Sequence, residues 1–270
     1  MTNTISAAAN PALANNLLNE AFNEGPTEPV EATITPPSDT TVQLPGGYIT
    51  ASGELLRTAE VRELTGKDEE AISKASSVGK ALLTILDRGL VSVGDTKASE
   101  SALNFMLAAD RETILLGILK VTFGKTADIP TYCSGCNDFK TVAVDLDEDV
   151  KIKMLANPIE DRVFMVEGKK GPIKVQLPTG LAQKELINNA DKTAAELNTI
   201  LLEKTVLEIN GAPVYNKIQV QNLGVVDRKK ILEEISLRSP GPQFNDIQLP
   251  CPDCEGEVTV SINLGTLFQF

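Results

Sequence analysis

The segment Cys133-Ser134-Gly135-Cys136, ahead of an alternating stretch from Lys140 to Leu146, has a second version in Cys251-Pro252-Asp253-Cys254, ahead of Glu257 to Leu264. The alternation of apolar and polar residues predicts a half-buried strand after each cysteine pair. Two sulfurs three residues apart on a tight turn can bind one ion, and Gly135 favours such a turn. Two such segments in one chain indicate a metal centre shared between distant parts of the sequence.

A structural zinc site needs four ligands, and each segment supplies two. The chain has no histidine to complete a site locally. We therefore predict one structural Zn²⁺ bound by all four cysteines: Cys133, Cys136, Cys251 and Cys254. With four protein ligands the site would have no open position for catalysis. Iron is the alternative metal, because a four-cysteine site also suits iron.

Three other roles for the cysteines stay open. Two redox pairs would need a βαβ context, which the sequence does not display. Two structural disulfides are disfavoured by the expected cytoplasmic origin. A zinc ribbon that binds nucleic acid or a polymerase is disfavoured by the acidic balance of the chain.

Other segments of the first part also return later in the same order, although their spacing drifts as the loops differ in length. Such ordered similarity predicts an internal duplication. The matched segments are Val42 to Gly47 with Val175 to Gly180, Glu63-Leu64 with Glu185-Leu186, Leu82 to Leu86 with Leu197 to Leu201, and Asp110-Arg111 with Asp227-Arg228.

Each half is predicted to contain a strand, a long helix, a shorter helix, then the CxxC turn and its strand. The expected fold class is α+β, with halves at residues 42–150 and 151–270. Thr65 to Asp68 fits a capping box, from which a helix should continue to about Arg88. Asp110 and Asp227 are expected to be the N-caps of the shorter helices. Val163 to Val166 and Ile173 to Leu177 flank a glycine-containing turn, which predicts a hairpin.

Residues 1–41 are predicted to form an extended N-terminal arm, because they have little to bury and contain five acids without Lys or Arg. A short amphipathic helix is expected from Asn10 to Phe22. This helix would dock either on a neighbouring subunit or on its own domain.

The bulk composition excludes several classes of function. A net charge of −12 in 270 residues disfavours binding to nucleic acid and to anionic membranes. No apolar run has the roughly 20 residues of a membrane helix, and no secretory signal is expected. The absence of histidine removes the commonest general base, so we expect a protein without enzymatic activity.

Several of these motifs together resemble the baseplate and baseplate hub assembly proteins of T-even type phages. The resemblance spans residues 42–270 and omits the arm. Its motifs are the Leu44-Pro45-x-Gly47 start, Val61 to Glu70, Asp110-Arg111, the first CxxC, Pro240-Gly241-Pro242, Cys251-Pro252-x-Cys254 and Phe268.

The resemblance implies a role in tail or baseplate assembly, in a protein made in the bacterial host cytoplasm. The acidic arm favours a structural component that stays in the virion tail, because an arm of this length can connect adjacent subunits. Its partners would be other baseplate or tail proteins, contacted in part through the arm. One alternative is a hub assembly chaperone that is absent from the mature virion. A second is the zinc-ribbon adaptor for nucleic acid or polymerase.

Overall fold

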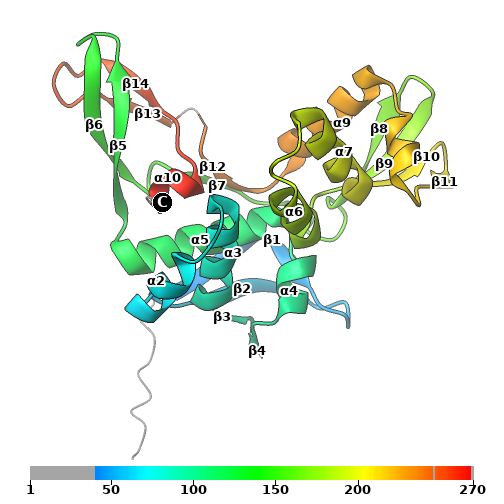
Figure 1. The fold of residues 1–270 in the computed structure, drawn as a ribbon, viewed down its shortest axis with the longest axis horizontal. Coiled ribbons are helices and arrows are strands. Elements are labelled where there is room, and N and C mark those ends of the chain that lie inside the picture. The colour runs from blue at the N-terminus through cyan, green and yellow to red at the C-terminus, as the bar shows by residue number, and fades with distance from the viewer. Residues whose placement is uncertain (1–39, 246, 269–270) are drawn as a thin grey trace, which may run out of the picture. The chain divides into compact units, whose positions relative to one another are not determined.

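The computed structural model describes residues 40–245 and 247–268 (Figure 1). The predicted arm and its helix from Asn10 to Phe22 lie outside these residues, apart from the last positions of the arm. The described residues belong to one compact unit of mixed helices and strands, which confirms the α+β class. Within the described ranges no helix has the length and apolar character needed to cross a bilayer.

The first part of the unit builds a four-stranded antiparallel sheet in the order β1-β2-β3-β4. Helices α3 and α5 pack against each other, and α5 also packs on β1. A long hairpin of β5 and β6 follows. The elements are β1 (Thr41–Ile49), β2 (Leu55–Val61), α2 (Gly66–Ile72), α3 (Val78–Gly89), β3 (Leu90–Val93), β4 (Thr96–Lys97), α4 (Glu100–Phe105), α5 (Ala108–Phe123), β5 (Thr126–Cys133) and β6 (Asp138–Asp145).

The second part builds another four-stranded sheet, in the order β8-β9-β10-β11. The predicted hairpin is confirmed, because β8 and β9 pair antiparallel around the turn at Gly168–Gly171. Strand β12 pairs with β7, and β13 with β14. The elements are β7 (Lys151–Lys153), β8 (Val163–Gly168), β9 (Gly171–Gln176), α6 (Gly180–Asn188), α7 (Ala194–Thr205), β10 (Val206–Ile209), β11 (Ala212–Pro213), α8 (Lys217–Gln221), α9 (Val225–Arg238), β12 (Gly241–Gln243), β13 (Ile247–Pro250), β14 (Glu257–Val260) and α10 (Leu264–Leu267).

The predicted long helix to Arg88 is wrong, because two helices occupy this stretch. The capping box at Thr65 is present and starts α2, but α2 ends at Ile72. Ser77 then adopts an extended conformation and caps α3 by accepting a hydrogen bond from the Lys80 N–H at 3.3 Å. A serine can interrupt a helix because its side chain can instead cap the N-terminus of a new helix. The predicted order of lengths is also wrong, since the later helix α5 has 16 residues and α3 has 12.

The predicted N-cap roles of Asp110 and Asp227 are wrong as well. The N-caps are Leu107 and Gly224, and each aspartate is the third residue of its helix. Both side chains instead accept a backbone hydrogen bond, Asp110 from strand β1 and Asp227 from the turn between β8 and β9. Asp110 Oδ1 lies 2.6 Å from the Gly46 nitrogen, and Asp227 Oδ1 lies 3.0 Å from that of Lys169.

Two of the matched segment pairs do not fall on equivalent elements. Val42 to Gly47 lies in the edge strand β1, whereas Val175 to Gly180 spans the end of the inner strand β9 and the start of α6. Glu63-Leu64 precedes α2, whereas Glu185-Leu186 lies inside α6. The later matches do occupy corresponding places, in α3 and α7, in α5 and α9, and in the two hairpin turns.

The apolar side chains gather into two clusters. The second is centred on β8, β9, α7 and α9, and contains Phe164, Val175, Leu202 and Ile231. The first joins β1, β2, α3 and α5 to both CxxC hairpins, so residues 247–268 pack with the first sheet. The end of the described chain is therefore anchored beside elements that precede it by more than a hundred positions.

Candidate metal centre

Two hairpin turns place the cysteines. Cys133 is the last residue of β5, and Cys136 lies in the turn before β6. Cys251 follows β13, and Cys254 lies in the turn before β14. Strand β14 packs on β5, and the inward side chains Val142, Val144, Val258 and Val260 share the first core cluster. This apolar contact holds the two turns against each other.

The four sulfurs form one cluster in which all ligand atoms lie within 4.8 Å of one another. Across the two turns, Cys133 Sγ lies 3.6 Å from Cys254 Sγ, and Cys136 Sγ lies 3.8 Å from Cys251 Sγ. Zinc–sulfur bonds of about 2.3 Å in a tetrahedron separate the sulfurs by about 3.8 Å, whereas a disulfide needs about 2.05 Å. All four predicted ligands therefore come together as free cysteines that could hold one metal ion.

The turns share a backbone feature that the sequence analysis missed. The residue after the second cysteine has a positive φ in both, 53° at Asn137 and 57° at Glu255. Asparagine tolerates this conformation, so Asn137 carried a detectable signal, while Glu255 carried none. The Tyr132 hydroxyl donates a 2.7 Å hydrogen bond to Asn137 Oδ1 and so supports the first turn.

Gly135 has a different role from the one expected. Its φ is not among the positive values, so the turn itself does not require glycine there. A Cβ at this position would instead lie 3.2 Å from Cys254 Sγ. Gly135 is therefore needed for the close approach of the opposite sulfur.

The backbone also favours the ligand form of one thiol. The N–H groups of Asp253 and Cys254 point at Cys251 Sγ and lower the pKa of the Cys251 thiol to about 7. The neighbouring Cys254 sulfur, together with burial, raises the pKa of Cys136 to about 12. Adjacent sulfurs thus compete for protons, and a bound dication removes this competition because metal-bound cysteines are thiolates.

Lys140 is a second residue that the sequence analysis missed as part of this site. Its Nζ lies 2.8 Å from Asp253 of the second turn and 3.3 Å from Asp138 beside the first. These carboxylates raise the pKa of Lys140, the Asp253 hydrogen bond most strongly. The ammonium therefore links the two turns and adds positive charge beside the cysteine cluster.

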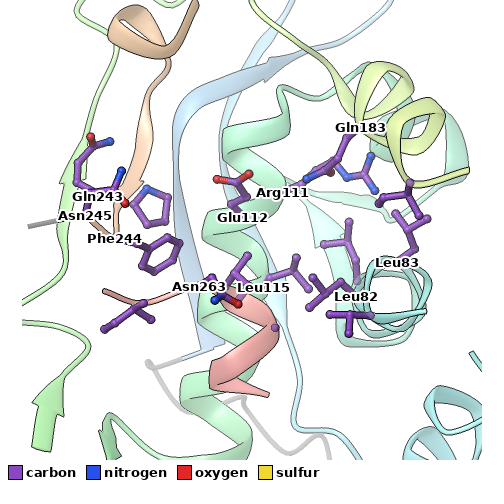
Figure 2. A pocket seen from close by; sticks show the side chains of 17 residues that line it. Leu82, Leu83, Arg111, Glu112, Leu115, Gln183, Gln243, Phe244, Asn245 and Asn263 are labelled. Atoms are coloured by element: carbon purple, nitrogen blue, oxygen red, sulfur yellow. The ribbon is translucent and has the colours of Figure 1, made fainter. Parts of the chain in front are cut away.

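A pocket of about 490 Å³ is separate from this centre and is lined by α3, α5, α6 and the segment before α10 (Figure 2). Figure 2 shows Arg111 reaching towards Gln183 of α6, next to Glu112. Arg111 is 3% exposed, and its Nε has no hydrogen-bond partner within the described ranges. Burial lowers the pKa of Arg111 to about 10 and raises that of Glu112. Arg111 also packs against α6, because a Cβ on Gly180 would lie 2.4 Å from its Nη1.

Comparison with protein families gives a match. Searches of curated proteins and of solved structures return none. The model of a family described as T4 bacteriophage base plate protein matches residues 39–210, a stretch that includes the first sheet, strands β8 to β10 of the second sheet and the first CxxC turn. The predicted resemblance is thereby confirmed, and the chain belongs to the T4 bacteriophage base plate protein family.

Proposed function

We propose that this protein is a non-enzymatic structural component of the phage tail baseplate that stays in the mature virion. We further propose that Cys133, Cys136, Cys251 and Cys254 hold one structural Zn²⁺. Family membership supports the baseplate role. The observation that carries the metal role is the cluster of four sulfurs from two hairpins far apart in the chain.

The donor set favours zinc in a structural role. Four thiolates fill a tetrahedral coordination sphere, so neither water nor substrate has a free position on the ion. Such an ion would fasten the β13–β14 hairpin to the β5–β6 hairpin and add its binding free energy to folding. Iron would fit the same ligands and is distinguished by its colour and by metal analysis.

We also propose that the chain arose by internal duplication. Both four-stranded sheets have the same strand order, and the helices follow in the same sequence between the strands. The two CxxC hairpins then occupy matching places after α5 and α9. Asp110 and Asp227 take the same position in their helices and bind the backbone in the same manner.

The partners would be other baseplate and tail proteins. The acidic composition of residues 1–41, with five acids and no Lys or Arg, suits an arm that binds a basic neighbouring surface. The net charge of −12 favours protein partners over nucleic acid.

Mass spectrometry of purified mature particles tests virion residency. A structural component is present in stoichiometric amounts, whereas an assembly chaperone is found in lysates and not in particles. Metal analysis of the purified protein tests the centre: we expect one zinc per chain, lost in Cys133→Ser and in Cys251→Ser but kept in Ser134→Ala. Two metals per chain, or zinc that survives either serine variant, would overturn the shared site.

A further inference from the structure

An extended connection of the first half docks on a helix start of the second half. Ala108 N–H donates to the Pro178 carbonyl at 2.9 Å, and Gly180 N–H donates to the Met106 carbonyl at 2.9 Å. Leu107 and Thr179 thus form an isolated antiparallel bridge. The Leu107 side chain is 2% exposed and belongs to the second core cluster. We call Met106–Ala108 the plug and Pro178–Gly180 the socket.

Both surfaces have a counterpart in the opposite half. The N-caps Leu107 and Gly224 have nearly the same backbone angles, φ −61° and ψ 144° against φ −59° and ψ 146°. The N-caps Thr179 and Thr65 also agree, with φ −103° and ψ 176° against φ −108° and ψ 167°. The second plug is therefore Leu223–Val225, and the second socket is Leu64–Gly66.

The backbone groups that pair in the docked plug and socket lack partners in the second set. Within residues 40–245 and 247–268 no hydrogen bond is made by the Gly66 N–H, the Leu64 carbonyl, the Val225 N–H or the Leu223 carbonyl. The second plug and the second socket thus carry two unpaired donors and two unpaired acceptors. They are the counterparts of the groups that pair between Met106–Ala108 and Pro178–Gly180. Exposed strand-like backbone of this kind favours pairing with another chain.

The side chains around the second set suit an interface. Val225 is 83% exposed and Val226 57% exposed, although both are apolar. The second socket borders a pocket of about 470 Å³ whose lining mixes apolar residues such as Ile72 and Phe123 with polar ones such as Glu69. An exposed apolar segment and a partly apolar hollow are both typical of surfaces that a contact buries.

We infer that copies of this chain associate head to tail, with Leu223–Val225 of one copy pairing with Leu64–Gly66 of the next, as Met106–Ala108 pairs with Pro178–Gly180 within the chain. This inference rests on the proposed duplication. The contact is heterologous, so it generates a closed ring or an open chain of copies rather than a twofold dimer. The occupant is a second copy because the chain itself carries the matching half of the contact.

Proline at the first position of each helix tests the pairing. Gly66→Pro and Val225→Pro each remove one backbone donor, while proline is well tolerated at this helical position after an extended residue. Ala194→Pro makes the same change at the exposed start of α7, outside both surfaces, and is the matched control. Circular dichroism verifies that each variant folds.

Light scattering after size-exclusion chromatography, over a concentration series, gives the mass. We expect wild type and Ala194→Pro to exceed the mass of one chain as concentration rises, and Gly66→Pro and Val225→Pro each to lose this association. An equimolar mixture of the two interface variants should recover the mass of two chains and no more, since each keeps the surface that the other lacks. Wild type that stays at one-chain mass, interface variants that associate like wild type, or a mixture that stays monomeric would overturn the inference. Zinc content and presence in particles are measured separately, so the baseplate proposal can stand when the head-to-tail contact fails.

Discussion

Cys133 and Cys254 are 121 positions apart in the chain, yet their sulfurs lie 3.6 Å from each other. The contact crosses from the first hairpin to the second, as does the one between Cys136 and Cys251. Each turn thus meets the other through both of its cysteines. A ligand cluster of this kind depends on the packing of β14 on β5 as well as on the turns themselves.

Gly135→Ala should weaken metal binding without unfolding the protein. The new methyl group would lie 3.2 Å from Cys254 Sγ, closer than carbon and sulfur normally pack, so the opposite turn must shift. We expect a loss of zinc affinity of about tenfold or more, in the range seen when groups that position metal ligands are altered. Competition with a chromogenic chelator measures it. Ser134→Ala, in the same turn, is the control, and equal affinities in the two variants would contradict the close-approach role.

Asp110→Asn should change how stability depends on pH. Burial raises the pKa of Asp110 to about 7, against about 3.9 in an unfolded chain. A raised pKa means that the folded state favours the protonated form. The contribution of protonated Asp110 to the stability of the fold is therefore fully present below about pH 4 and is lost as the pH rises through about 7. Asparagine retains an acceptor for the Gly46 N–H but cannot ionise. Urea unfolding at about pH 5 and about pH 8 should show the variant gaining stability relative to wild type at the higher pH. A difference in unfolding free energy that is the same at both pH values would contradict the raised pKa of Asp110.

Asp68→Asn should have the opposite pH dependence. The Asp68 carboxylate is bound by Arg62 at 2.8 and 3.0 Å and by the Thr65 N–H at 2.9 Å, which hold its pKa well below the usual range. A lowered pKa gives stability that is present above about pH 4 and lost below it. We expect a loss of about 1–3 kcal/mol at neutral pH, since a buried charge-assisted hydrogen bond and a capping box are both impaired. The exposed Asp87→Asn on α3 is the control, and urea unfolding at about pH 7 that gives equal stabilities would contradict the prediction.

The two CxxC turns, the hairpin at Gly168–Gly171 and the capping box at Thr65 could be predicted from the sequence because each depends on local chemistry. The break between α2 and α3 could not, since the apolar period resumes after Ser77 and hides the interruption. Strands as short as β4 and β11, with two residues each, carry no alternation to detect. The packing of the β13–β14 hairpin on the first core depends on long-range tertiary contacts, which no local sequence pattern predicts. Lys140 and Asp253 meet only as a result of it.

Gly180→Ala and Gly66→Ala form a pair that separates the docked socket from its unpaired counterpart. Both glycines are the first residue of their helix. At Gly180 a Cβ would lie 2.0 Å from the Leu103 carbonyl oxygen and 2.4 Å from Arg111 Nη1, whereas at Gly66 it meets nothing within 4 Å.

Helix propensity alone would favour alanine at both positions. We instead expect Gly180→Ala to lose about 1–3 kcal/mol through steric overlap at the junction, and Gly66→Ala to be neutral or slightly stabilising in dilute protein. Urea unfolding of the two variants measures the difference. Equal stabilities would mean that the junction between Met106–Ala108 and Pro178–Gly180 accommodates the added methyl group. The junction would then not be the rigid contact on which the head-to-tail association is patterned.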